Sequence, residues 1–365
     1  MLNKQRLAIP GPTPVPERVL AAMHRQPIGH RASEFSELLY SIYAKLGQIF
    51  MTERPVHTFA SPGTGVMVAA ADNFFKEGDR VLVLVNGLFG ERFRDICRRH
   101  RLFVEGMDFE WGGGISLEAL EERLSEDKNK MIKGVFFQHN ETSTGVLNGA
   151  ENILGLIGNH GALSIVDAIS GVVVAPFYQD EWGADVVLGA SQKGFMMTPG
   201  LAFMSASERA MNARKRTSPR NPYFDIQVAE RTFETGNPYC TPAVNSMFGL
   251  DAALDMLLEE GLENCWERHT KMMRMVRSRM RAWQLDLLAE DEDASPAVTA
   301  VRFSQPGKLE KLLKEKYNVI ISGGYGKLDR KIFRLAHLGY VDEMDMEGIL
   351  SALRDSLCDL GHFFN

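Results

Sequence analysis

The stretch from Leu163 to Met204 constrains the fold of this chain more than any other segment. It contains three short apolar runs, at 163–166, 186–188 and 201–204, and turn residues separate each run from the next. Short, bounded apolar runs rich in β-branched residues are typical of strands buried on both faces of an α/β sheet. Because ligands of such sheets bind beyond the carboxyl ends of the strands, the polar residues that follow these runs are candidates for a functional site.

Two of those polar residues can carry chemistry. Asp167 ends the first run, and Lys193 follows the second. A lysine among apolar neighbours has a lowered pKa and becomes a nucleophilic amine that can form a Schiff base. A buried carboxylate needs a partner, and a protonated pyridine nitrogen is a suitable one. The pair therefore suggests a site for pyridoxal 5′-phosphate (PLP). Taken alone, a loop lysine on the surface and an aspartate in a cap or salt bridge remain open.

Composition limits the setting in which this chain works. Its length of 365 residues suffices for a large α/β domain and a smaller second one, and its net charge of −6 argues against nucleic acid as a main partner. The four cysteines are widely separated, and no apolar run reaches 18 residues. We therefore expect a cytoplasmic protein with no membrane partner. The sequence contains no HExxH motif, so we expect no metal site.

The order of the patterns predicts an N-terminal arm over residues 1–16, a large domain over 17–262 and a small C-terminal α+β domain over 263–365. The arm is rich in proline and glycine and should be extended. Strands alternate with helices through the large domain, which indicates parallel βα units. Residues 207–245 are polar and contain four prolines, so we expect a long irregular region there.

Two glycine-containing turns join a strand to a helix near the start of the large domain. Ser61–Gly65 (SPGTG) precedes a helix expected from Val66, and the amide groups at such a helix start can bind phosphate. The turn is not a P-loop, because no GK[ST] follows. Phe89 precedes a second helix, expected over 91–100, and could stack on a flat ring or be an ordinary core residue.

Further candidates follow later strands. Thr142 and Gln192 could donate hydrogen bonds to a ring oxygen or a phosphate, or could belong only to turns. Arg334 lies within the apolar segment Phe333–Leu335. A buried arginine needs a carboxylate, which can be internal or part of a ligand and can be bound in a bidentate fork.

Together these motifs resemble the class V aminotransferases of the PLP-dependent fold type I, in particular the alanine–glyoxylate and serine–pyruvate aminotransferase group. The segments that carry the resemblance span almost the whole chain: Gly11–Thr13, Ser61–Gly65, Asn86–Gly90, His139–Gly145, Val166–Ser170, Gly189–Lys193 and Gly261–Glu263. The resemblance implies an α/β fold whose large domain has a mostly parallel seven-stranded sheet covered by helices.

The resemblance also implies a role for each site residue. Lys193 would hold PLP and move the Cα proton, Asp167 would pair with the pyridine nitrogen, and Arg334 would bind the substrate carboxylate. Phe89 and Ile169 would cover the two faces of the PLP ring, and Thr142 would bond to its hydroxyl side. The phosphate would be bound by Gly63, Thr64 and Gln192 and, from the neighbouring subunit of a homodimer, by Tyr239 and Thr241. The role of His337 is open.

The expected activity is transamination by a ping-pong mechanism, from an alanine- or serine-type donor to a glyoxylate- or pyruvate-type 2-oxo acid. A PLP-dependent lyase or desulfurase is the alternative on the same fold. Desulfurases of this superfamily usually have histidine before the lysine and a mobile cysteine, whereas here Gln192 precedes Lys193 and the loop 323–326 has no cysteine. A non-catalytic binding protein is the alternative from another class, and the presence of both Lys193 and Asp167 argues against it.

Overall fold

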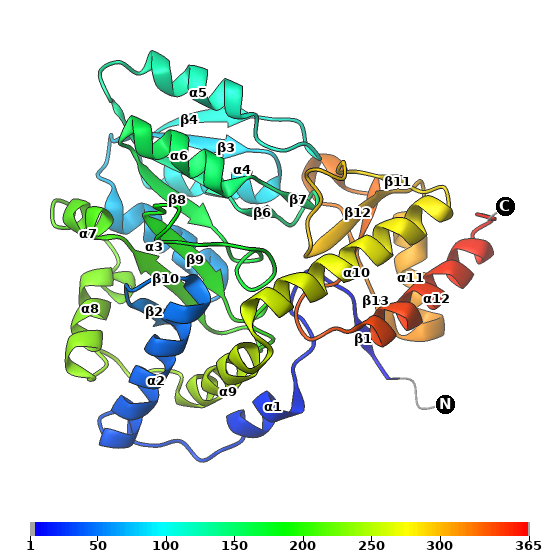
Figure 1. The fold of residues 1–365 in the computed structure, drawn as a ribbon, viewed down its shortest axis with the longest axis horizontal. Coiled ribbons are helices and arrows are strands. Elements are labelled where there is room, and N and C mark those ends of the chain that lie inside the picture. The colour runs from blue at the N-terminus through cyan, green and yellow to red at the C-terminus, as the bar shows by residue number, and fades with distance from the viewer. Residues whose placement is uncertain (1–3, 364–365) are drawn as a thin grey trace.

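A computed structural model describes residues 4–363 of the chain (Figure 1). A seven-stranded sheet with the order β2-β10-β9-β8-β5-β3-β4 forms its centre. The strands are β2 (Val56–Phe59), β3 (Arg80–Val85), β4 (Phe103–Asp108), β5 (Ile132–Gln138), β8 (Leu163–Asp167), β9 (Val186–Ala190) and β10 (Ala202–Ala206). Strand β10 runs antiparallel to both of its neighbours, β2 and β9, and the other neighbouring pairs in this sheet are parallel. The prediction of a mostly parallel seven-stranded sheet is thus confirmed.

Helices cover both faces of this sheet because successive strand residues point to opposite sides. On β3, Leu82 and Leu84 join one hydrophobic core, while Val81 and Val83 join another. The helices around the sheet are α1 (Glu17–Met23), α2 (Ser33–Phe50), α3 (Gly63–Phe74), α4 (Leu88–Arg99), α5 (Leu117–Glu126), α6 (Ala150–His160), α7 (Glu208–Arg214), α8 (Ile226–Thr235) and α9 (Val244–Glu260). The cores hold the sheet rigid, so the residues beyond its strand ends are fixed relative to one another.

Two helices start earlier than the sequence pattern predicts. The helix expected from Val66 begins at Gly63, and the helix expected from Glu91 begins at Leu88. The glycine motifs therefore form the first helical turns themselves instead of preceding them. This places Phe89 on a helix, one turn before Arg92.

The prediction of a long irregular region over 207–245 is wrong, because the region contains α7 and α8 joined by the short helix η1 (Pro222–Phe224). Ser207 and Asp225 cap the two longer helices, accepting hydrogen bonds from the N–H groups of Ala210 and Gln227. None of the prolines lies inside α7 or α8, so proline content did not exclude helices here.

A four-stranded sheet of order β11-β12-β15-β14 lies at the right of Figure 1. Its elements and those packed with it are β11 (Asp286–Leu287), β12 (Val298–Arg302), α11 (Pro306–Tyr317), β14 (Ser322–Gly323), η2 (Gly326–Leu328), β15 (Ile332–Ala336) and α12 (Glu343–Asp359). The short strand β13 (Val319–Ile320) precedes β14, and a separate hairpin contains β6 (Asn140–Glu141) and β7 (Val146–Leu147).

The N-terminal arm connects this second unit to the large sheet. Its strand β1 (Arg6–Leu7) pairs with β13, and Thr13 N–H donates to the carbonyl of Gln192. The long helix α10 (Leu262–Ala282) contributes Trp266 to the core of the large sheet and Met272 to the core of the small one. We therefore propose the same division, with an arm over 1–16, a large domain over 17–262 and a small domain over 263–365. The ends at 1–3 and 364–365 lie outside the described residues.

Across residues 4–363, none of the helices combines the length and the apolar character needed to cross a membrane.

Candidate active site

A cavity of about 420 Å³ opens at the carboxyl edge of the large sheet, where the small unit meets it. This volume lies in the range of small-molecule sites, roughly 300–1,000 Å³. The predicted site residues that line it are Gly63, Thr64, Phe89, Thr142, Asp167, Ile169, Gln192, Lys193 and Arg334. The structure therefore brings together all of the predicted site residues except Tyr239 and Thr241.

Lys193 lies in the loop after β9, in apolar surroundings. Phe195, Met196 and Met197 follow it and are all buried. Burial lowers the pKa of the Lys193 amine to about 8, because it disfavours the charged form. The Nζ group donates a hydrogen bond to the carbonyl of Pro10 in the N-terminal arm. The amine is thus closer to its nucleophilic, neutral form at physiological pH than an exposed lysine.

Gly11 explains how the arm can pass so close to this lysine. Its φ of +127° lies in a region that other residues avoid. A Cβ atom at this position would lie 2.9 Å from Lys193 Nζ. Glycine at position 11 thus leaves the space that the lysine side chain occupies.

Asp167 is the last residue of β8, and its carboxylate is buried beside the cavity. It accepts a hydrogen bond from the backbone N–H of Ile169, over 3.0 Å. Burial raises the pKa of this carboxyl group to about 7, and the nearby Glu141 carboxylate adds to the increase, while Lys193 and Arg92 oppose it. A cation placed in the cavity beside Asp167 would stabilise the ionised form.

Glu141 is a buried carboxylate that the sequence analysis did not single out, although it lies within the His139–Gly145 motif. It accepts hydrogen bonds from the backbone N–H groups of Phe89 and Gly90, over 3.0 and 3.2 Å. It also accepts bonds from the N–H and hydroxyl of Ser143, over 2.9 and 2.6 Å. Glu141 therefore anchors the first turn of α4 and with it the position of the Phe89 ring.

Arg334 reaches the cavity from β15 of the small sheet and is buried to 2% exposure. Its Nε donates to the carbonyl of Gly323 over 2.8 Å, and Nη1 donates to the carbonyl of Thr142 over 3.1 Å. The Tyr325 ring lies 4.5 Å from the guanidinium carbon. These neutral partners orient the guanidinium without cancelling its charge, so the charge remains available to a ligand carboxylate.

Thr142 ends a chain of hydrogen bonds that crosses from the small unit. Its hydroxyl lies 2.6 Å from that of Ser170, which accepts from the amide of Asn140 over 2.8 Å. The hydroxyl of Ser295 donates to the same Asn140 amide group over 2.5 Å. The chain fixes the Thr142 side chain at the cavity wall.

The residues of the cavity fit a cofactor that carries both a phosphate and a cationic ring. No side chain caps the N-terminus of α3, which begins at Gly63. A Cβ atom on Gly63 would lie only 2.8 Å from the Ile169 side chain, so the backbone there is open only because the residue is glycine. The buried Gln192 Oε1 has no hydrogen-bond partner in the described part of the chain. The uncapped amide groups of α3 match the phosphate of PLP, and the buried Asp167 carboxylate matches its protonated ring nitrogen.

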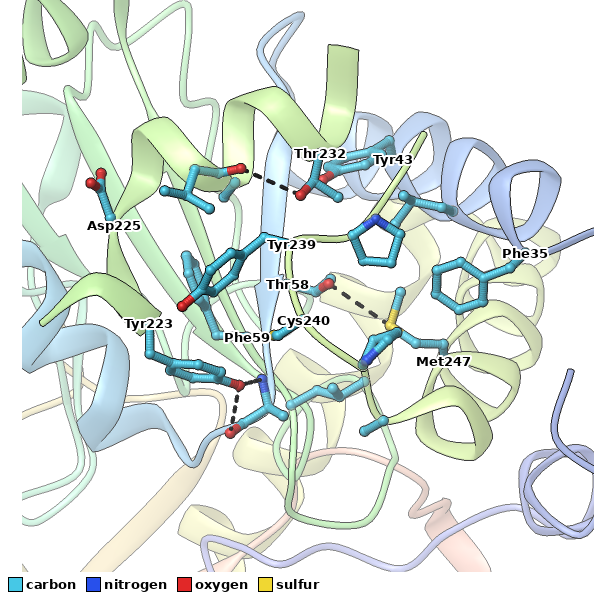
Figure 2. Close-up of a pocket in the computed structure, with 18 residues that line it drawn as sticks. Phe35, Tyr43, Thr58, Phe59, Tyr223, Asp225, Thr232, Tyr239, Cys240 and Met247 are labelled. Carbon is cyan, nitrogen blue, oxygen red and sulfur yellow. Dashed lines mark hydrogen bonds between the residues drawn. The ribbon is translucent and has the colours of Figure 1, made fainter. Parts of the chain in front are cut away.

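Tyr239 and Thr241 do not line this cavity. Tyr239 and Cys240 instead line a second pocket with Phe35, Tyr43 and Met247, which Figure 2 shows between the α2 and α8 segments. Tyr239 remains 52% exposed. Their expected contact with a neighbouring subunit stays a prediction.

His337 has a structural role outside the Lys193 cavity. Its Nδ1 donates to the carbonyl of Pro296 over 2.8 Å, and its Nε2 accepts from the hydroxyl of Thr299 over 3.0 Å. The ring is fully buried, which lowers its pKa to about 4 and keeps it neutral. Both nitrogens are thus used to join the ends of β12 and β15.

Residues 7–328 match the family described as Aminotransferase class-V. The chain belongs to this family. It is 40% identical over 368 residues to a protein of Anabaena cylindrica named soluble hydrogenase 42 kDa subunit, covering 99% of this chain and 95% of that protein. It is 34% identical over 371 residues to a serine–glyoxylate aminotransferase of Methylorubrum extorquens, covering 98% and 92%.

The structure is also similar to that of a solved aminotransferase. An alanine–glyoxylate aminotransferase from Nostoc sp. superimposes with a TM-score of 0.93 at 30% identity, covering 98% of this chain and 96% of that one. The class-V aminotransferase is therefore an enzyme of fold type I, and its family uses PLP as cofactor. The expectations of family, fold class and cofactor are confirmed.

Proposed function

We propose that this aminotransferase transfers an amino group from a small amino acid of the alanine or serine type to a small 2-oxo acid of the glyoxylate or pyruvate type. The observation that carries the proposal is the meeting of Lys193, Asp167 and Arg334 in one cavity. Glyoxylate occurs in the names of both the Methylorubrum and the Nostoc relatives, which supports it as acceptor.

Lys193 is the catalytic residue of the proposed reaction. It would hold PLP covalently through Nζ. After the substrate amine has replaced Lys193 on PLP, the free lysine amine would accept the proton from Cα of the substrate and then donate it to the cofactor. A pKa near 8 suits a group that must both take and release a proton close to neutral pH. Bound PLP supplies an electron sink for the charge that develops at Cα.

Asp167 and Arg334 would orient the reactants around Lys193. The Asp167 carboxylate would bind the protonated ring nitrogen, and Arg334 would bind the substrate carboxylate. Phe89 and Ile169 would cover the two ring faces and exclude water, while Thr142 would donate toward the ring hydroxyl. The proposed phosphate contacts are Gly63, Thr64 and Gln192. Because one Arg334 site serves both substrates in turn, the two half-reactions follow one another in a ping-pong sequence.

We further propose a homodimer with shared active sites, in which Tyr239 and Thr241 reach the phosphate of the neighbouring subunit. Tyr40 and Tyr239 are large side chains that are 42% and 52% exposed, and both lie near α2 and α8. Exposed aromatic side chains of this kind favour an interface. We place the enzyme in the cytoplasm, because its cysteines at 97, 240, 265 and 358 are all free.

The hydrogenase name of the Anabaena relative describes that protein. Within residues 4–363 of this chain, no three or more His, Cys, Asp or Glu side chains form a group that could hold a metal ion. The Lys193–Asp167 arrangement supports transamination, so we propose that activity for this chain.

An absorption experiment tests the proposal. Purified protein loaded with PLP should show a visible band that bleaches with L-alanine or L-serine and returns with glyoxylate or pyruvate, each half-reaction proceeding without the other substrate. Lys193→Ala should abolish turnover, while Lys133→Ala, at an exposed position, should leave it unchanged. A protein that stays colourless with added PLP, or a Lys193→Ala variant with the wild-type rate, would refute the assignment.

A further inference from the structure

Arg92 lines the cavity from α4, although no sequence pattern singled it out. It lies one helical turn after Phe89, so both side chains project from the same face of α4. Its Nη1 donates a hydrogen bond to the hydroxyl of Thr64 over 3.2 Å. Its guanidinium carbon also lies 4.8 Å from the centre of the Phe89 ring. Arg92 thus contacts two of the proposed cofactor-binding residues, which belong to different helices.

The charge of Arg92 is not neutralised by an acidic neighbour. In the described part of the chain, no carboxylate oxygen lies within 4.0 Å of its guanidinium. The adjacent Glu91 pairs instead with Arg94, over 3.6 Å, and with Lys327, over 3.9 Å. A partly buried guanidinium whose contacts are a hydroxyl and an aromatic ring retains N–H groups for an anion.

The hydrogen bond from Arg92 also determines what the Thr64 hydroxyl can do. Because the Thr64 oxygen accepts from Arg92, its own hydrogen remains available as a donor. Thr64 is the second residue of the 12-residue helix α3, whose N-terminus has no side-chain cap. Three sets of donors therefore belong to one wall of the cavity: the Arg92 guanidinium, the Thr64 hydroxyl and the first amide groups of α3.

We propose that Arg92 is a further binding residue for the phosphate of PLP. Its guanidinium binds the phosphate directly, holds the Thr64 hydroxyl as a second donor and supports the outer face of the Phe89 ring. The proposal deepens the proposed function, on which it rests for the position of the phosphate. A second carboxylate on an acidic amino-acid substrate has the same anionic chemistry, and the experiment below distinguishes the two sources.

The test compares PLP with pyridoxal, which has the same ring but no phosphate. Cofactor-free wild type and Arg92→Met are titrated with each compound by equilibrium dialysis. Removing a charge-assisted contact should weaken PLP binding about ten- to hundredfold and change pyridoxal binding less than about twofold. Arg92→Lys, which keeps the charge but loses the planar fork, should fall between the two proteins. Arg98→Met, at an exposed position on the same helix, is the matched control and should match wild type.

Two other outcomes of these titrations would overturn the proposal. Equal weakening of PLP and pyridoxal would assign Arg92 only to support of the Phe89 ring, since stacking is common to both compounds. Unchanged PLP affinity, together with a raised KM for aspartate but not for alanine, would assign the anion to the substrate. The two dialysis titrations are independent of the proposed transamination, because a wild type that binds PLP but transfers no amino group would refute the activity and leave the binding comparison valid.

Discussion

Asp167→Asn should stabilise the cofactor-free protein even though it removes a functional residue. Asparagine has nearly the same shape and can still accept the hydrogen bond that Ile169 N–H donates over 3.0 Å. The variant loses only the carboxylate charge, whose burial raises the pKa of Asp167 from 3.8 to about 7. The substitution therefore separates the energetic cost of this charge from the packing of the side chain.

The size and sign of the effect follow from proton linkage. Between pH 4 and pH 7 the unfolded chain loses the Asp167 proton while the folded chain keeps it, so the contribution of this group to stability falls as pH rises. Each unit of difference between the folded and unfolded pKa corresponds to about 1.4 kcal/mol, so roughly three units give about 4 kcal/mol at most. Asparagine has no such loss. The variant should thus match wild type near pH 4 and exceed it by up to ~4 kcal/mol near pH 7.5.

Urea denaturation of both cofactor-free proteins at pH 4.5 and pH 7.5 measures this difference. The upper pH lies below the pKa of Lys193, which burial lowers to about 8. Above that pH the lowered pKa makes stability rise with pH, which is opposite to the effect of Asp167. The same variant should bind PLP more weakly and lose turnover, because the carboxylate partner of the ring nitrogen is gone. A stability difference that is the same at both pH values would refute the reasoning.

Two further predictions concern the residues that orient the reactants. Arg334→Ala should raise KM for carboxylate substrates about tenfold or more, because a charge-assisted contact is lost, while PLP affinity should change little. Steady-state kinetics measure KM, and cofactor titration measures PLP affinity. An unchanged KM would remove Arg334 from the site. Glu141→Gln should lower the free energy of unfolding by about 1–3 kcal/mol and weaken PLP binding, because an amide cannot accept from the N–H groups of both Phe89 and Gly90 while also accepting from Ser143. Urea denaturation checks the first effect, and a variant as stable as wild type would contradict the role of Glu141 as an anchor.

Much of the candidate site could be predicted because parallel strands impose a simple geometry. Residues that follow β5, β8 and β9 must meet at one edge of the sheet, whatever the details of packing. Asp167 and Lys193 could therefore be paired from their positions after apolar runs alone. The roles of Phe89, Thr142 and Arg334 needed the resemblance to a family as well, because each pattern also fits an ordinary core, turn or strand residue.

Other parts depended on where helices start, which local patterns define poorly. The first turns of α3 and α4 contain glycines that weaken a helical pattern. The N-terminus of α4 is nevertheless stabilised by Glu141, which lies 52 and 51 positions from its partners Phe89 and Gly90. Only this tertiary contact places Phe89 and Arg92 on one helical face. In the same way, α7 and α8 form in a polar, proline-containing segment because side-chain caps and packing outweigh its composition.

The sequence by itself thus determined the sheet, the edge at which ligands bind and the residues that follow its strands, because buried strands must be apolar and chemistry needs polar groups where they end. The tertiary structure alone decided which further side chains reach that edge. Arg92, Glu141 and Tyr325 enter the site through contacts between helices, hairpin and small sheet that are distant along the chain. Such contacts depend on how whole elements pack against one another, and neither hydrophobic periodicity nor a short sequence motif predicts this packing.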